Sequence, residues 1–195
     1  MMLPMISNLS ELDAALALIH RAYRELTEEE NYNLKLPPLG AMIEVPAAVY
    51  QVKEIGSRVD FMSVGTNDLT QYLLAVDRNN PRVAEIYDSL HPSVLRALKS
   101  IQEQAVSVDC QLSVCGEMAG DPVSAVVLMG LGYKNLSMSA SSLLRVKSLM
   151  LKVSREMAEN WVDEALCLSD APSVGRFMSE ALAPFTLKQS KQASS

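Results

Sequence analysis

Short apolar segments alternate with longer segments of helical periodicity along most of the chain. The short segments are rich in β-branched residues and methionine, and the longer ones place an apolar residue every three or four positions. A repeated strand-then-helix order predicts a parallel sheet covered by helices, because parallel strands need a long crossover between them. The strands read as apolar on both faces, as in a doubly wound sheet or a barrel. The predicted strands are residues 2–6, 39–43, 59–64, 112–114 and 135–138.

Start signals for helices lie between these strands. Asn8, with Glu11 three residues later, resembles a capping box, and an amphipathic segment follows it. After residue 142 the pattern becomes wholly helical, with Gly175 as a weak point in the last helix. The chain ends in a polar segment rich in Gln, Ser and Lys, which predicts a disordered tail. Three further helices, each with a proline in its first turn, are predicted at residues 46–55, 92–106 and 122–129.

The composition argues against several classes of protein. A formal net charge of −6 and a pI near 5.0 disfavour a nucleic-acid partner, which needs a cationic surface. No apolar run approaches the roughly 18 to 20 residues of a membrane span, so no membrane association is expected. The cysteines, Cys110, Cys115 and Cys167, show neither metal-ligand spacing nor an even disulfide framework. We therefore expect a cytoplasmic protein.

Several predicted strands end in side chains that can carry chemistry. Glu44 follows the second strand, Asn67 and Asp68 follow the third, and Cys115 follows the fourth. The carboxyl ends of parallel strands lie on one rim, and neighbouring strands stand only about 4.8 Å apart. Glu44 and Asp68 could therefore share one cation. Mg²⁺ suits a pair of carboxylates whose coordination is completed by water and substrate oxygens.

Each of these residues also has a purely structural interpretation. Asp68 could cap the helix that follows it, and Glu44 could form a buried salt bridge. Arg78, in the segment VDRNN, could be a solvated side chain paired with Asp77. Cys115 could fill space at the end of a strand. Because Cys115 has no His or second Cys beside it in the sequence, a thiolate nucleophile is disfavoured.

Five ordered segments carry a resemblance to a known family: GAMIEVPAA, FMSVGTNDLTQYLLAVDR, LHPSV, VCGEMAGDP and GLGYKNLSMSASSLLRVK. Through them residues 2–147 resemble the phosphoenolpyruvate (PEP)-binding barrel of Enzyme I of the bacterial phosphotransferase system, and we favour its nitrogen-related branch. The wider family of PEP-utilising enzymes includes pyruvate phosphate dikinase and phosphoenolpyruvate synthase. The resemblance implies an α/β fold that is part of a TIM (β/α)8 barrel, about its last five βα units, with extra C-terminal helices.

The resemblance also implies a role for each candidate residue. It implies that Glu44 and Asp68 bind Mg²⁺, and that Asn67, Asp68 and Arg78 contact PEP. It further makes Cys115 the catalytic residue that donates a proton to the enolate of pyruvate. These residue types suit phosphoryl transfer, which relies on positioning and charge stabilisation. An ordinary thiol, with a pKa of about 8.5, stays protonated at neutral pH and can act as an acid.

An activity and partners are implied in the same way. In the family, a full-length enzyme transfers the phosphate of PEP to a histidine in a separate N-terminal domain and then to an HPr-like phosphocarrier protein, and it forms a homodimer. Neither His20 nor His91 has the sequence context expected of that histidine. One alternative is a dimerisation or interaction module without catalysis, which uses the helices of residues 142–182. Another is a dikinase-like enzyme.

A full barrel has eight strand–helix units, and only five are predicted here. We therefore expect a fragment that is inactive as a transferase on its own and retains at most weak Mg²⁺-dependent ligand binding. Its open sheet edges and apolar inner face are expected to pair with another chain or to force a non-barrel arrangement. The expected parts are a partial PEP-utiliser barrel at residues 1–147, C-terminal helices at 148–187 and the disordered tail at 188–195.

Overall fold

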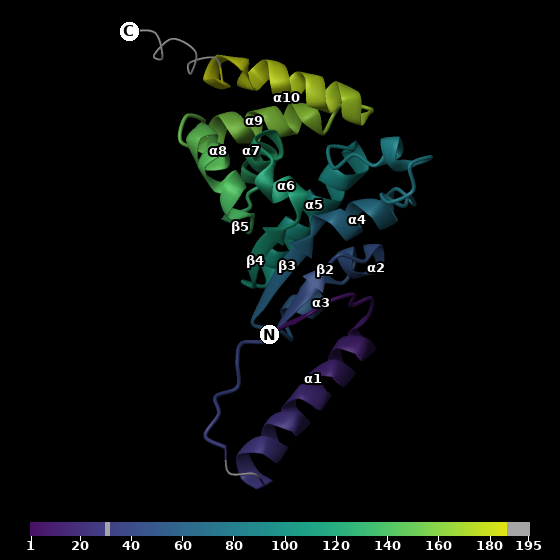
Figure 1. The fold of residues 1–195 in the computed structure, drawn as a ribbon, viewed down its shortest axis with the longest axis vertical. Coiled ribbons are helices and arrows are strands. Elements are labelled where there is room, and N and C mark those ends of the chain that lie inside the picture. The colour runs from purple at the N-terminus through teal and green to yellow at the C-terminus, as the bar shows by residue number, and fades with distance from the viewer. Residues whose placement is uncertain (30–31, 187–195) are drawn as a thin grey trace.

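The computed structural model describes residues 1–29 and 32–186 of the chain. Five strands form one parallel sheet, and their order in the sheet follows their order in the sequence (Figure 1). All five lie where the sequence predicts strands, so the α/β fold with a parallel sheet is confirmed. The predicted disordered tail, residues 188–195, lies outside the described residues. The strands are β1 (Met2–Leu3), β2 (Gly40–Ile43), β3 (Phe61–Gly65), β4 (Gln111–Cys115) and β5 (Asn135–Leu136).

The first and last strands are shorter than predicted, at 2 residues each. β1 ends before Pro4, which has no backbone N–H to donate to a neighbouring strand. Met5 then takes a left-handed conformation with φ of 57°, which turns the chain away from the sheet. The backbone N–H of Met5 is thereby released from the strand ladder and left free to bond elsewhere.

The helices begin at the signals that the sequence predicts. The Asn8 side chain accepts the Glu11 N–H at 3.0 Å, whereas the Glu11 carboxylate accepts the Ser7 N–H rather than that of Asn8. The helix predicted at residues 46–55 is broken, because Gln51 leaves the helical region with φ of −127° and ψ of 17°. The helical elements are α1 (Leu9–Arg24), the π-helix η1 (Glu25–Glu29), α2 (Pro46–Val49), α3 (Val52–Gly56), α4 (Thr66–Leu73), the 3-10 helix η2 (Ala84–Ile86), α5 (Pro92–Ser107), α6 (Glu117–Gly120), α7 (Pro122–Gly130), α8 (Ala140–Met150), α9 (Arg155–Ala165) and α10 (Ala171–Thr186).

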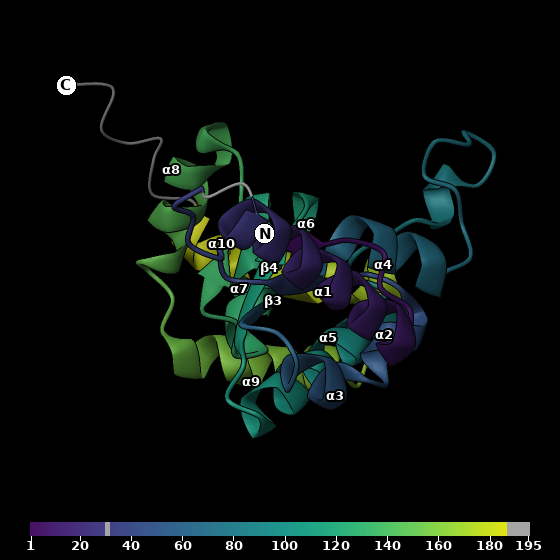
Figure 2. The same cartoon turned by 90° about the horizontal axis from the view of Figure 1, so that it is seen from below.

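The two faces of the sheet differ in chemistry. Met62, Val64 and Val114 are fully buried in a core that also contains residues of α3 and α5, which lie on one side of the strands (Figure 2). The opposite face carries Ser63 and Ser113, which are register partners on β3 and β4. The prediction of strands apolar on both faces is therefore wrong for the middle of β3 and β4, whereas Met42 and Phe61 keep part of the same face apolar. Helices cover the other face of the sheet.

The sequential strand order distinguishes between the two predicted architectures. In a doubly wound sheet the strand order reverses at a switch point, whereas here each strand neighbours the next one in the sequence. Crossovers of one hand between consecutive parallel strands place their helices on the same face. The sheet therefore has the topology of an arc of a (β/α) barrel.

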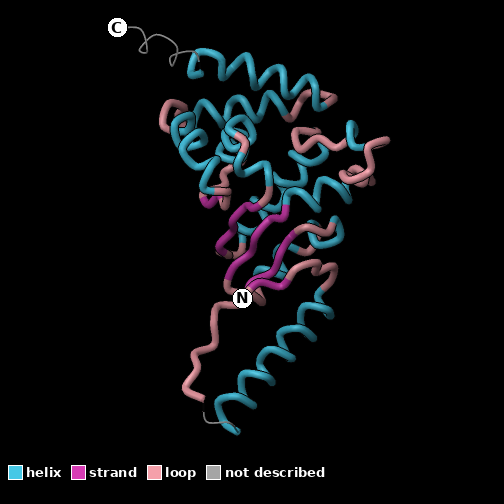
Figure 3. Tube along the Cα trace, viewed as in Figure 1, coloured by secondary structure: helices cyan, strands magenta, loops and turns pink. Residues whose placement is uncertain are grey.

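The C-terminal helices lie at one end of the molecule. Figures 1 and 3 show α9 and α10 side by side there, whereas α1 projects from the other end. Trp161 of α9 and Phe185 of α10 meet edge to face, with ring centroids 6.0 Å apart. The extra C-terminal helices are confirmed, although the predicted boundary at residue 147 falls inside α8. Among the residues that the structure describes, no helix combines the length and the apolar character needed to cross a membrane.

Candidate functional site

Glu44 lies directly after β2 and is almost completely buried, with 3% of its surface exposed. Its Oε1 atom accepts the backbone N–H of Met5 at 2.7 Å, so the turn after β1 orients this carboxylate. In the described part of the chain no Lys, Arg or His forms an ion pair with Glu44, and the predicted buried salt bridge is not seen there. A buried carboxylate without a cationic side chain fits a site that receives a metal ion.

The Glu44 side chain packs against Gly65, the last residue of β3, where a larger residue would not fit. A Cβ atom at Gly65 would lie 2.5 Å from Glu44 Oε2 and 2.9 Å from Glu44 Cβ. Gly65→Ala is therefore expected to displace the Glu44 carboxylate and to weaken ligand binding at this rim about 10-fold. Isothermal calorimetry of the variant measures the change. Gly175→Ala serves as the control, because a Cβ there has its nearest neighbour at 3.8 Å. Equal affinity in Gly65→Ala and wild type contradicts the prediction.

Asn67 and Asp68 lie in the first turn of α4, which begins at Thr66. Gly65 occupies the N-cap position, so the interpretation of Asp68 as the cap of this helix is wrong. A carboxylate in the first turn is still favoured by the positive end of the helix dipole. Asp68 Oδ1 lies 3.6 Å from Nη2 of Arg78, and both side chains remain about one-third exposed.

The Asn67 amide has a fixed orientation. Its Oδ1 atom accepts the backbone N–H of Glu117 at 3.0 Å, which leaves its NH₂ group as the donor that faces away from this bond. The close approach depends on Gly116, where φ is 107° and a Cβ would clash with Thr66 Oγ1 and Asn67 Oδ1. Thr66 in turn donates its hydroxyl to the carbonyl of Cys115 at 2.9 Å. These contacts hold the carboxyl ends of β3 and β4 together.

Cys115 lies at the carboxyl end of β4, on the face of the sheet that carries Ser63. Its thiol donates to the carbonyl of Val64 at 3.4 Å and lies 3.5 Å from the Ser63 hydroxyl. The side chain is half-buried and does not belong to the helix-covered core. A polar position at the rim, with the thiol as a donor, is compatible with the acid role and does not favour the packing role.

Arg78 lies in the loop between α4 and α5. Its Nη1 atom is buried and has no hydrogen-bond partner, whereas its Nη2 atom faces Asp68. Asp77 accepts the backbone N–H of Asn79 at 2.9 Å, and no ion pair joins Asp77 to Arg78 among the described residues, so the predicted pairing is wrong. A buried guanidinium donor without a partner is costly. The side chain as a whole remains about one-third exposed, so its accessible donors can meet an anionic oxygen.

The structure thus places all five candidate residues on one rim, but it does not combine them in one closed cavity. In the described residues no group of three or more His, Cys, Asp or Glu side chains is arranged to hold a metal. A two-carboxylate site for Mg²⁺, completed by water and substrate, remains compatible with Glu44 and Asp68. His91 is not at the centre of this site, since its Nδ1 atom accepts the Ser93 N–H at the start of α5.

A hollow adjoins the rim on the side of β5. Its volume is 460 Å³, and Asn67 forms part of its wall. Of the wall residues, only Asn67 was predicted to have a role in the site, and the others come from two segments, residues 116–121 and 138–145, whose first residues lie at or just after the ends of predicted strands. The segment CGEMAGDP was a signal for some of them, since it contributes four. The other wall residues are Gly116, Glu117, Gly120, Asp121, Met138, Ser139, Ser142 and Arg145.

Comparison with known proteins gives a consistent result. Residues 1–155 match the family described as "PEP-utilising enzyme, PEP-binding domain". A protein of Escherichia coli strain K12 named "Phosphoenolpyruvate-dependent phosphotransferase system" is 51% identical over 85% of this chain. A "Phosphoenolpyruvate-protein phosphotransferase" of Cupriavidus necator is 43% identical over 85% of the chain. The chain spans only 22% and 28% of these two relatives, respectively.

A solved structure supports the fold alone. A citrate lyase from Burkholderia xenovorans superposes with a TM-score of 0.52 at 15% sequence identity. The match covers 94% of this chain and 62% of the citrate lyase chain. At this identity the likeness concerns the arrangement of strands and helices and carries no information about the ligand.

Proposed function

Because the chain belongs to the family of PEP-binding domains of PEP-utilising enzymes, we propose that it binds PEP with Mg²⁺ where β2, β3 and β4 end. The observation that carries this proposal is that two groups on one rim each lack a partner of the opposite kind. Glu44 is a buried carboxylate with no cationic side chain beside it, and Arg78 has a buried donor with no acceptor. A magnesium ion and a phosphorylated carboxylic acid would satisfy both.

Each rim residue has a distinct task in this proposal. Glu44 and Asp68 hold the Mg²⁺ ion, which neutralises the negative charge of PEP and of the enolate left behind. The Asn67 NH₂ group donates to an oxygen of the substrate. Arg78 offers its planar guanidinium to the phosphoryl oxygens, where charge develops during transfer.

Cys115 acts after the phosphoryl group has left. Cleavage of the phosphorus–oxygen bond of PEP leaves the enolate of pyruvate, and the Cys115 thiol protonates its methylene carbon to give pyruvate. The resulting thiolate regains a proton from water. The thiol is suited to this step because it already serves as a donor at the rim, towards the carbonyl of Val64.

For the whole protein we propose the activity named for its relatives, a phosphotransferase that uses PEP. The phosphoryl acceptor would be a histidine outside this chain, followed by an HPr-like phosphocarrier. We further propose a cytoplasmic homodimer. A dikinase-like activity is less well supported, since both relatives described above carry phosphotransferase names.

Titration of the chain with PEP tests the proposal directly. We expect weak binding that strengthens at least about 10-fold when Mg²⁺ is added and that EDTA reverses, because the ion offsets charge on both ligand and site. Isothermal calorimetry measures the affinity for PEP with and without Mg²⁺, and sulfate serves as the control anion. Binding that is tight and indifferent to Mg²⁺, or no binding at all, contradicts the proposal.

An interaction module without catalysis is a second candidate, and the surface of α8 favours it. Leu143, Leu144 and Leu151 are 51%, 76% and 78% exposed, respectively, around this helix. Apolar side chains gathered in this way suit a contact with another protein surface. Self-association of a chain that fails to bind PEP in the titration above would support this candidate over the first.

A further inference from the structure

The Cys115 side chain meets β3 through a diagonal contact. Cys115 is the register partner of Gly65, which has no side chain, so nothing on β3 stands directly opposite the thiol. Ser63 lies two residues before Gly65 and therefore on the same face of the sheet, further from the rim. The Ser63 hydroxyl donates a hydrogen bond to Cys115 Sγ at 3.5 Å. The thiol thus lies against a serine that the proposed function does not yet use.

The Ser63 hydroxyl is a buried donor with a weak acceptor. Ser63 is only 4% exposed, and the bond to sulfur is the one side-chain hydrogen bond that its hydroxyl makes among the described residues. A neutral sulfur accepts hydrogen bonds poorly, so the bond contributes little while Cys115 is a thiol. A hydrogen bond to an ionised group is stronger, above all where water is excluded. The same contact therefore becomes more favourable when the sulfur loses its proton.

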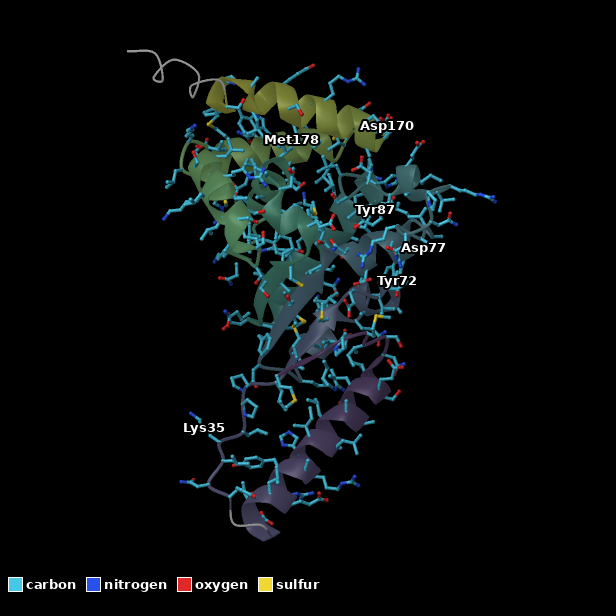
Figure 4. All side chains as sticks on the ribbon, viewed as in Figure 1. Lys35, Tyr72, Asp77, Tyr87, Asp170 and Met178 are labelled. Carbon is cyan, nitrogen blue, oxygen red and sulfur yellow. The ribbon has the colours of Figure 1, made fainter. Side chains whose placement is uncertain are left out.

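Both hydrogen bonds of the thiol in the described part of the chain are made with β3. The sulfur accepts from Ser63, and the S–H group donates to the carbonyl of Val64 at 3.4 Å. The charged loop after α4 lies elsewhere, since Asp77 and Tyr87 are found beyond α4, on the side away from β4 (Figures 1 and 4). Ser63 is therefore the side chain placed to respond to a negative charge on the sulfur.

We propose that Ser63 is a positioning residue for proton transfer by Cys115: its hydroxyl holds the sulfur at the rim and stabilises the thiolate that the transfer leaves behind. The transfer breaks the S–H bond and forms a C–H bond on the methylene carbon of the enolate, and Ser63 keeps its own proton. Water then returns a proton to the sulfur. This inference rests on the proposed function, because it takes the acid role of Cys115 as given. Ser63 itself touches no substrate atom.

Exchange of the methyl protons of pyruvate in deuterium oxide isolates this step, because it needs no phosphoryl acceptor. The Cys115 thiolate removes a methyl proton, the thiol exchanges that proton with solvent, and the enolate takes up a deuteron. Proton NMR with Mg²⁺ present measures the rate for the wild-type chain and for Ser63→Ala. We expect Ser63→Ala to slow exchange about 10-fold, the effect of losing a hydrogen bond to a charged group. The dissociation constant for PEP should change less than about 2-fold, since Ser63 does not contact the ligand.

Two further variants separate this role from packing. Ser113→Ala is the matched control, because it removes the same hydroxyl from the same face of the sheet. The Ser113 hydroxyl donates to the carbonyl of Met62 at 3.4 Å and not to the sulfur, so this variant should exchange at the wild-type rate. Ser63→Thr keeps a hydroxyl and is expected to recover most of the rate lost in Ser63→Ala. Equal exchange in Ser63→Ala and wild type, or equal losses in Ser63→Ala and Ser113→Ala, overturn the inference.

Alkylation by iodoacetamide tests the contact without any ligand. The thiolate is the reacting species, and peptide mass mapping gives the rate at each cysteine. Near neutral pH, Ser63→Ala is expected to slow modification of Cys115 about 3-fold, because a roughly 10-fold loss of thiolate is partly offset by the greater nucleophilicity of the thiolate that remains. Exposed Cys167 is the internal reference and should react at its wild-type rate.

The two measurements distinguish failure of this inference from failure of the proposed function. Equal alkylation rates at Cys115 in Ser63→Ala and wild type overturn the inference even if the wild-type chain exchanges the protons of pyruvate. Absence of exchange in wild type, together with slower alkylation of Cys115 in Ser63→Ala, overturns the acid role of Cys115 and leaves the contact between Ser63 and the thiolate established.

Discussion

Glu44→Gln is expected to abolish the gain in PEP affinity that Mg²⁺ provides, an effect of at least about 10-fold at saturating metal. The substitution removes the negative charge but keeps a side-chain oxygen that can accept the Met5 N–H, now 2.7 Å from Oε1. The fold should therefore survive, because the buried amide still makes the hydrogen bond that orients it. Calorimetric titration of PEP at increasing Mg²⁺ concentrations measures the loss, and circular dichroism verifies the fold.

Two further variants make the result specific. Asp68→Asn should act in the same direction, since it removes the other carboxylate proposed to hold the ion. Glu103→Gln makes the same chemical change at an exposed position on α5 and should leave the metal dependence intact. If Glu44→Gln and Asp68→Asn both retain the full effect of Mg²⁺, the metal is bound elsewhere and the assignment of these two residues is wrong.

The fold was predictable because its signals are local. Hydrophobic periodicity located every strand, and Pro92 and Pro122 marked helix starts that depend only on a missing N–H and a fixed φ. The errors arose where the tertiary environment, rather than the local sequence, decides which face of the sheet a side chain occupies. Ser63 and Ser113 were read as part of continuous apolar runs, although their alternation with Val64 and Val114 indicated two different faces.

The site was predictable in proportion to how closely each residue follows a strand. Glu44 and Cys115 were identified because the carboxyl ends of parallel strands meet on one rim. Arg78 lies in a loop, so the residues alone suggested a pair with Asp77, and only the family resemblance indicated substrate binding. Met5 gave no sequence signal. It acts through the backbone N–H of a left-handed residue, which is not visible in periodicity or spacing.

The contact between α7 and α9 depends on a glycine, and it gives the largest expected effect on stability. Gly130, the last residue of α7, faces the backbone carbonyl of Ala158, and a Cβ added to Gly130 would clash with that oxygen and lie 2.6 Å from Val162 Cγ2. A backbone atom in a packed helix cannot move aside as a flexible side chain can. Gly130→Ala is therefore expected to lower the free energy of unfolding by about 2 to 3 kcal/mol through overpacking.

Intrinsic helix propensity alone predicts that Gly130→Ala raises the free energy of unfolding, which is the opposite of the change expected from the close contact. The direction of the measured change therefore distinguishes the two effects. In an unobstructed helix, replacing Gly by Ala stabilises by about 0.5 to 1 kcal/mol. Gly175→Ala in α10 provides that reference, because the nearest atom to its added Cβ is Leu90 Cδ1 at 3.8 Å. Thermal denaturation should show a melting temperature about 4 to 12 °C lower for Gly130→Ala and slightly higher for Gly175→Ala. If both variants gain stability, α7 and α9 do not pack as closely as the structure shows, because only a close contact makes the first alanine unfavourable.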